Sequence, residues 1–398
     1  MPTNTIAFKV KSQAEKHIKQ GHPWVFENSI IKQNKDGLPG DLAIIFDQRF
    51  NKFLALGLYD PDSPIQIKIL STRNGDKLNQ SWLNTKLSEA KHKRAPLFQT
   101  DTNAYRLLFG ENDGLPGLIC DIYDKTAVLK IYSSIWFPYL DLVKDAITKT
   151  SGCDCIVIRL SRLVSKSDQG QQYQDGQIIS GNLVSEEIVF KEHGVRFSAN
   201  VIKGHKTGFF LDHRHNRYKV QQLASGHKVL DVFSYAGGFS VHALVGGAKE
   251  VTSLDISEQA LSLAKKNGAL NKTKGKHLTI CKDAFAELKN MTQLRKKFDL
   301  VIIDPPSFAK AAKEVDLALS QYDKLARLGV QLVSPGGMLL LASCSSRVTA
   351  DKLFQIYNSA LKSSGRKFEL IEKTFHDVDH PIGFAEGAYL KSGYYRIE

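Results

Sequence analysis

The sequence predicts an α/β protein whose C-terminal half contains a parallel β-sheet covered by helices on both faces. From about residue 190, short apolar runs alternate with segments of helical length. The strands that we expect are 228–233, 251–256, 277–283, 299–304 and 338–343. The helices between them include 258–270 and 322–333. This alternation is typical of βαβ units, in which a helix connects two parallel strands.

Residues 1–73 are predicted to form a separate small β domain, either a barrel or a sandwich. The runs 42–46, 53–59 and 65–70 are rich in isoleucine, leucine and phenylalanine, and glycine and proline separate them. Short apolar runs between such turn residues are typical of strands in an all-β domain.

Residues 74–190 are predicted to form a central α+β domain that begins with a polar linker. The helices and strands that we expect there are 83–92, 127–132, 139–148 and 155–160. The third predicted domain therefore runs from 191 to 398 and contains the parallel sheet.

The composition is that of a soluble globular protein, with 42% hydrophobic and 24% charged residues. A net charge of +13 suits a nucleic-acid partner or an acidic membrane surface, but it also fits a soluble protein that is merely basic. No apolar segment approaches the ~20 residues of a membrane span, and the N-terminus lacks a signal pattern. The five cysteines contain no C-x-x-C pair. We therefore expect a cytoplasmic protein without a membrane partner.

Four aspartates lie at or just after the ends of successive predicted strands: Asp231, Asp255, Asp283 and Asp304. The carboxyl ends of parallel strands meet at one edge of the sheet, where α/β proteins bind ligands. One such aspartate is often only a helix N-cap. Four in order favour a nucleoside cofactor, because a carboxylate such as that of Asp255 can accept hydrogen bonds from both ribose hydroxyls.

A glycine turn follows the first of these strands, in the stretch VLDVFSYAGGFSVHAL at 229–244. Gly237 and Gly238 are predicted to let the backbone approach a ligand closely. The stretch is not G-x-G-x-x-G, so the phosphate cradle of a dinucleotide site is missing.

The order LDVFSYAGGFS, SLDIS, CKDAF and IIDPPSF resembles class I S-adenosylmethionine-dependent methyltransferases. More narrowly, the chain resembles bacterial methyltransferases that modify cytosine C5 in large-subunit ribosomal RNA. Stretches similar to that family span nearly the whole chain, and GHKTGFFLDHRHNR at 204–217 and SCS at 343–345 are the most specific. The resemblance implies an N-terminal PUA domain, a central domain and a Rossmann-like catalytic domain. It also implies ribosomal RNA as partner, and it leaves the oligomeric state open, a homodimer included.

The same resemblance implies a role for each strand-end residue. Asp231 and the turn from Ser234 to Gly238 would face the methionine part of S-adenosylmethionine. Asp255 would hold its ribose, and Asp283 would lie beside its adenine. Asp304 would meet the target base.

Cys344 follows the predicted strand 338–343 and is expected to face the same crevice as Asp304. A thiolate that adds to cytosine C6 makes C5 nucleophilic, and a proton or strong hydrogen bond at N3, supplied by Asp304, assists the addition. A free cysteine in an apolar strand is otherwise usually a small buried hydrophobe. The match to the family's SCS favours Cys344 as the nucleophile.

The stretch DPPSF leaves an alternative open, because it also resembles the Asp/Asn-Pro-Pro-aromatic loop of enzymes that methylate exocyclic amines. Many cytosine-C5 enzymes carry a second cysteine where this chain has Ser307. The alternatives are therefore an RNA methyltransferase that acts on a guanine or an amino group, and a non-catalytic RNA-binding protein with this fold.

The stretch GHKTGFFLDHRHNR is basic. Lys206, Arg214 and Arg217 are predicted to contact RNA phosphate or the carboxylate of the cofactor. His213 and His215 have no third ligand at a known spacing, so no metal site is expected.

Overall fold

The computed structural model describes residues 4–309 and 311–398. The chain forms two compact units, and each is built from segments that are distant in the sequence. Unit 1 comprises the chain up to Lys191, Ser198–Leu211 and Val378–Ala385. Unit 2 comprises Glu192–Phe197, Asp212–Asp377 and Glu386–Glu398. The sequence did not predict that the segments Ser198–Leu211 and Val378–Ala385 belong to unit 1. The division into three domains stays a prediction.

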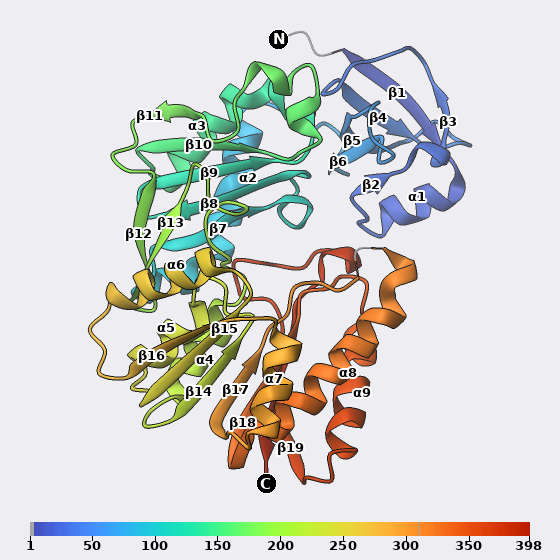
Figure 1. The fold of residues 1–398 in the computed structure, drawn as a ribbon. Coiled ribbons are helices and arrows are strands. Elements are labelled where there is room, and N and C mark those ends of the chain that lie inside the picture. Colours follow the sequence, from blue (N-terminus) through green and yellow to red (C-terminus); the bar gives the residue numbers. More distant parts are fainter. Residues whose placement is uncertain (1–3, 310) are drawn as a thin grey trace. The chain divides into compact units, whose positions relative to one another are not determined.

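The N-terminal part of unit 1 is a six-stranded sheet with the order β2-β6-β5-β4-β1-β3 (Figure 1, blue). Its strands are β1 (Thr5–Val10), β2 (Trp24–Val25), β3 (Ile30–Gln33), β4 (Leu42–Phe46), β5 (Phe53–Tyr59) and β6 (Ile67–Ser71). Helix α1 (Ser12–Lys19) contributes Ala14 and Ile18 to the core that these strands bury. The predicted strands 42–46 and 53–59 are confirmed to the residue.

The second sheet of unit 1 has five strands in the order β11-β10-β9-β8-β7. Its strands are β7 (Ala104–Phe109), β8 (Leu118–Tyr123), β9 (Thr126–Ile131), β10 (Cys155–Leu160) and β11 (Ile178–Gly181). Helices α2 (Gln80–Lys93) and α3 (Leu140–Ser151) pack against each other beside it (Figure 1). The hairpin of β12 (Glu187–Glu192) and β13 (Val195–Asn200) carries the chain between the units.

Unit 2 contains a seven-stranded sheet with the order β16-β15-β14-β17-β18-β20-β19 (Figure 1). Its strands are β14 (Lys228–Val232), β15 (Glu250–Asp255), β16 (Lys276–Cys281), β17 (Phe298–Ile303), β18 (Val333–Ser343), β19 (Phe368–Thr374) and β20 (Lys391–Ile397). Strands β14 to β18 are parallel, whereas β20 is antiparallel to β18 and to β19. The predicted parallel sheet is confirmed, and its last two strands were not predicted.

Helices cover both faces of this sheet, which explains its uninterrupted apolar strands. They are α4 (Arg214–Leu223), α5 (Gly238–Val245), α6 (Glu258–Ala269), α7 (Ala284–Gln293), α8 (Val315–Leu332) and α9 (Ala350–Lys362). In β17, Leu300 and Ile302 belong to the core shared with α4 and α5. Val301 and Ile303 belong to the core shared with α7, α8 and α9. The alternation places the residue after Ile303, Asp304, at the carboxyl edge of the sheet.

Candidate active site

The structure brings the strand-end aspartates to one edge of the sheet in unit 2. Asp231 is the fourth residue of β14, and Asp255 is the last residue of β15. Asp304 directly follows β17, and Asp283 lies two residues beyond β16. Because β14 to β17 are parallel, all four positions lie at the carboxyl edge.

Asp231 is buried, and only one of its oxygens is hydrogen-bonded within the described chain. Its Oδ2 accepts from the backbone N–H of Ser240 at 3.0 Å and from the Ser240 hydroxyl at 2.6 Å. Burial, helped by the charges of Asp304 and Asp255, raises the pKa of Asp231 to about 7. The buried Oδ1 and the buried hydroxyl of Ser234 have no hydrogen-bond partner among the residues that the structure describes. Buried polar atoms without partners are rare, so both fit a ligand that would supply them.

The loop after β14 has an unusual backbone, with Phe233 at φ 63° and Tyr235 at φ 46°. Such conformations are strained for bulky residues and concentrate at functional sites. The backbone N–H of Tyr235 donates to Oδ2 of Asp255 at 2.8 Å, and Ser257 N–H donates to Oδ1 at 2.9 Å. Asp255 is thus tied to the loop that also holds Ser234.

Gly237 has a structural role, and its predicted contact with a ligand stays a prediction. Its φ is 75°, and a Cβ atom there would lie 2.8 Å from the Cβ of Ala264. The glycine therefore allows α5 to pack closely on α6. This packing accounts for a glycine at position 237 without a bound ligand. Access of a ligand to the backbone at Gly238 stays a prediction.

Asp283 also has a structural role that the sequence left open. Its exposed carboxylate caps α7 and accepts from the backbone N–H of Ala286 at 2.9 Å. A helix cap accounts for an aspartate at this position. Its place beside adenine stays a prediction.

Asp304 is less buried than its apolar strand suggested, with 23% of its side chain exposed. Its Oδ1 lies 3.3 Å from Nε2 of the buried His213, slightly beyond the usual range for a hydrogen bond, and the contact is an ion pair only when His213 is protonated. Burial alone would lower the pKa of His213, but the carboxylates of Asp304 and Asp212 outweigh burial and raise it. No sequence pattern indicated the contact between His213 and Asp304.

Cys344 lies on the neighbouring strand end, directly after β18. Its Sγ is 3.8 Å from the backbone oxygen of Pro305, which follows Asp304. Burial and then the charges of Asp304 and Asp212 raise the pKa of Cys344 to about 12. The thiol is therefore protonated at neutral pH, and it needs a nearby proton acceptor to become a nucleophile. The structure thus brings Cys344 and Asp304 together.

Lys391, at the start of β20, supports the loop that follows Cys344. Its Nζ donates to the backbone oxygens of Ser345 and Val348, the latter at 2.6 Å. In the antiparallel register it pairs with Ser343, the residue before Cys344. Burial lowers the pKa of Lys391 to about 8, and a negative charge on Cys344 would raise it.

Phe308 is half-buried and packs against the protein core beside the aspartate loop. Its ring makes an edge contact with Tyr322, with 5.2 Å between ring centroids, and a tilted contact with Phe285 at 6.3 Å. It also packs against the core shared with α7, α8 and α9. An aromatic ring that stacks on a base would have to leave these contacts.

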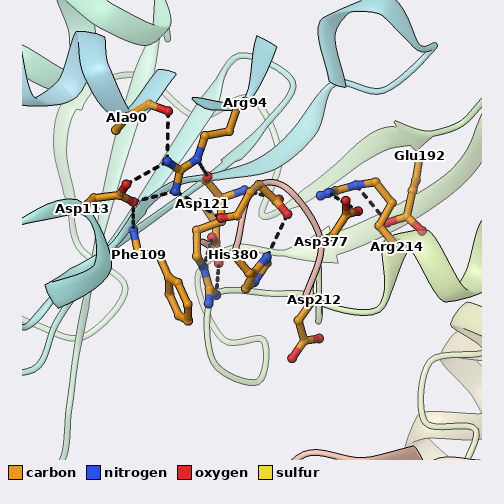
Figure 2. Close-up of polar contacts among 12 residues, drawn as sticks. Ala90, Arg94, Phe109, Asp113, Asp121, Glu192, Asp212, Arg214, Asp377 and His380 are labelled. Carbon is orange, nitrogen blue, oxygen red and sulfur yellow. Dashed lines mark hydrogen bonds and ion pairs between the residues drawn. The ribbon is translucent and has the colours of Figure 1, made fainter. Parts of the chain in front are cut away.

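The structure does not expose Arg214 and Arg217 for the predicted contact with RNA phosphate or with the carboxylate of the cofactor, because both side chains are buried in ion pairs. Arg217 holds both oxygens of Glu192, at 2.6 and 2.7 Å. Arg214 lies 3.2 Å from Asp377 and 3.8 Å from Glu192 (Figure 2). Charged residues are rarely fully buried unless they are paired in this way. Lys206 is exposed and belongs to unit 1, so its contact with RNA stays a prediction.

A second buried ionic network, in unit 1, was also missed. Arg94 binds both oxygens of Asp113, at 2.9 and 2.6 Å, and also donates to the backbone oxygen of Ala90 at 3.0 Å (Figure 2). Asp113 additionally accepts from the N–H of Phe109 at 2.8 Å. The carboxylate of Asp379 accepts from the N–H of Arg106 at 2.9 Å, which ties the returning segment Val378–Ala385 into unit 1. Asp113 and Asp379 therefore each have a structural role within unit 1.

The model of the S-adenosylmethionine-dependent methyltransferases matches residues 168–387, and the model of the PUA-like domain matches residues 8–72. This chain belongs to the S-adenosylmethionine-dependent methyltransferase family. The predicted PUA-like domain and Rossmann-like catalytic domain are thereby confirmed.

Relatives of this methyltransferase match along almost its full length. A ribosomal RNA large subunit methyltransferase of Deinococcus radiodurans is 42% identical over 99% of this chain and 98% of its own. The ribosomal RNA large subunit methyltransferase I of Citrobacter koseri is 32% identical over 95% of this chain and 96% of its own.

Solved structures support the same fold. A chain of Streptococcus mutans described as a SAM-dependent methyltransferase has a TM-score of 0.82 at 22% identity and covers 98% of this chain and 99% of its own. Another methyltransferase structure, complexed with SAH, has a TM-score of 0.80 at 21% identity over 99% of this chain and all of its own.

The edge of the methyltransferase sheet fits S-adenosylmethionine. The unpartnered Oδ1 of Asp231 and hydroxyl of Ser234 suit the charged amino-acid part of the cofactor. Asp255 retains lone pairs for the ribose hydroxyls, because a carboxylate can accept about four hydrogen bonds. Within residues 4–309 and 311–398, no group of three His, Cys, Asp or Glu side chains is arranged to hold a metal ion. No helix in these ranges is long and apolar enough to cross a membrane.

Proposed function

We propose that this methyltransferase modifies C5 of a cytosine in large-subunit ribosomal RNA through a covalent bond between Cys344 and C6. The observation that carries the proposal is the placement of a thiol and a carboxylate on adjacent strand ends of the methyltransferase sheet. The names of the relatives support ribosomal RNA as the substrate.

Cytosine C5 is a poor nucleophile, so the reaction needs a step that activates the ring. Sulfur of Cys344 bonds to C6 while its proton passes through the Asp304 carboxylate to N3, which leaves an enamine whose electron pair lies at C5. S-adenosylmethionine, when bound, supplies an electrophilic methyl group. After C5 has gained the methyl group, a base removes the C5 proton. The N3 proton then returns through Asp304 to sulfur as the carbon–sulfur bond breaks.

The thiol's environment supports this route for the proton. With a pKa of about 12, Cys344 cannot ionise by itself at neutral pH. Among the carboxylates that raise this pKa, Asp304 acts most strongly. Asp304 follows the strand next to the one that ends before Cys344, so we propose that its carboxylate accepts the thiol proton as sulfur adds to C6.

The packing of Phe308 argues against methylation of an exocyclic amine. That chemistry uses the aromatic residue of the loop as a stacking surface, whereas Phe308 is packed against Tyr322 and Phe285. Transfer to an amine also has no use for a thiol. With Ser307 in the loop, Cys344 alone would both attack and leave, and we propose that the PUA-like domain and Lys206 add affinity for RNA.

The proposal is tested with ribosomal RNA transcribed with 5-fluorocytidine in place of cytidine. Fluorine at C5 cannot leave as a proton, so the enzyme should remain bonded to RNA after methyl transfer. We expect an adduct that survives denaturing electrophoresis, and mass spectrometry should locate the modified peptide at Cys344. Methylation of ordinary RNA without any adduct on fluorinated RNA would contradict the proposal.

A further inference from the structure

His213 is a buried histidine in the active site that the proposed reaction does not yet use. It directly precedes α4, and its Nε2 lies 3.3 Å from Oδ1 of Asp304. The other ring nitrogen also has a polar neighbour: Nδ1 lies 3.1 Å from Nδ2 of Asn216. The ring also makes an edge contact with Phe239, with centroids 5.4 Å apart.

Asn216 indicates which nitrogen of His213 carries the proton. Its Oδ1 accepts from the hydroxyls of Thr374, at 2.7 Å, and of Tyr394, at 3.1 Å. Its Nδ2 is thereby turned toward Nδ1 of His213, which must then accept. A neutral ring that accepts at Nδ1 carries its proton at Nε2. The proton therefore points at Asp304.

Three charged residues act on the pKa of His213. Asp304 lies across the ring at the end of β17, Asp212 is the preceding residue, and Arg217 is on α4. The two carboxylates favour the imidazolium, whereas burial and Arg217 oppose it, and the balance raises the pKa of His213. Protonation would place an N–H at Nδ1 against the amide N–H of Asn216. Asn216 would then have to turn over and exchange its contacts with Thr374 and Tyr394.

We infer that neutral His213 is a positioning residue that holds Oδ1 of Asp304, so that the other Asp304 oxygen exchanges the proton between Cys344 and N3. This inference rests on the proposed function. An imidazolium at His213 would pair with the Asp304 carboxylate and make it a weaker proton acceptor for the thiol. Protonation of His213 thus switches the addition step off, and formation of the adduct should decline as the pH falls through the pKa of His213.

Two substitutions distinguish the positioning of Asp304 by His213 from the titration of His213 itself. His213→Gln keeps an N–H that can donate to Asp304 but cannot gain a proton. His213→Leu removes both properties. His215→Gln, at an exposed position two residues away, is the matched control. The rate of adduct formation on 5-fluorocytidine RNA is measured from pH 5.5 to 8.5 for each full-length protein. SAH binding by calorimetry and thermal unfolding verify that each variant is folded.

The wild type and His215→Gln should lose adduct formation at acidic pH, with a midpoint above 6.5, the ordinary value for histidine. His213→Gln should form adduct at pH 8 within about threefold of the wild type, and this acidic decline should be absent. His213→Leu should be at least about tenfold slower at every pH, with SAH binding retained.

Two results would overturn the role of His213. One is an unchanged acidic decline in His213→Gln, and the other is a wild-type rate in a folded His213→Leu. Because a wild type that forms no adduct contradicts the proposed function instead, the two failures are distinguishable. If His213→Leu does not fold, the pH profile of His213→Gln alone still decides.

Discussion

Asp231→Asn should stabilise the free protein and weaken its binding of cofactor. The amide has nearly the same shape, and its oxygen can still accept both hydrogen bonds from Ser240. The substitution removes a buried negative charge whose Oδ1 has no partner. Stability and binding should therefore change in opposite directions, as is common at functional sites.

The magnitude of the stabilisation follows from the pKa of Asp231. Burial raises this pKa from 3.8 to about 7. A carboxyl with a raised pKa in the folded state adds stability below its unfolded pKa, and this stability is lost as the pH rises through the folded pKa. About three pK units correspond to about 4 kcal/mol of lost unfolding free energy above pH 7, as an upper bound. Asp231→Asn should recover part of this at pH 8 and almost none at pH 4.

The loss of affinity is expected because Asp231→Asn removes the negative charge that would face the charged amino-acid part of the cofactor. A hydrogen bond to a charged group contributes about 1.5–3 kcal/mol, so Asp231→Asn should weaken SAH binding by about 10- to 150-fold at pH 8. Calorimetry measures the affinity, and thermal unfolding at pH 4 and pH 8 measures the stability.

Asp299→Asn is the control for this experiment, because Asp299 accepts from the backbone of Lys228 at the opposite edge of the same sheet. It should not weaken SAH binding. If Asp231→Asn binds SAH as the wild type does, Asp231 does not hold the charged part of the cofactor. If Asp231→Asn lowers the stability at pH 8, the buried charge of Asp231 does not destabilise the folded protein.

Two further substitutions test the supporting residues. Lys391→Met should slow methylation about tenfold or more, because the backbone oxygens of Ser345 and Val348 lose the donor that holds the loop after Cys344, whereas Lys391→Arg should restore part of the rate. A methyl-transfer assay checks this, and equal rates in all three proteins would exclude the role. Arg217→Ala should lower the free energy of unfolding by about 3–5 kcal/mol, because it leaves Glu192 buried without its bidentate partner. Denaturant unfolding measures the loss. An unfolding midpoint equal to that of the wild type, together with weaker RNA binding, would instead indicate that Arg217 contacts RNA.

Local sequence pattern predicted the parts of the fold that depend on neighbours along the chain. The apolar run before Asp304 predicted a strand buried on both faces, and β17 has one core on each side. The carboxyl ends of parallel strands lie at one edge of the sheet, so the sequence alone predicted that Asp231, Asp255 and Cys344 lie at the same edge.

Contacts between distant segments could not be predicted in this way. Arg217 and Glu192 are 25 residues apart, and His213 and Asp304 are 91 apart, so no helix or strand period relates them. A basic stretch looks the same in sequence whether it faces solvent or a buried carboxylate. The role of Gly237 depends on Ala264 of another helix, and that packing is known only once the helices are placed.

The central claim is that the sulfur of Cys344 bonds to the target cytosine. Its most direct test is the covalent adduct formed on 5-fluorocytidine ribosomal RNA by the wild type and by Cys344→Ala, with Cys281→Ala as the matched control at an exposed thiol. The wild type and Cys281→Ala should form the adduct, and Cys344→Ala should form none while it still binds SAH. An adduct that persists in Cys344→Ala, or methylation of ordinary RNA by that variant at a rate near the wild type's, would contradict the account.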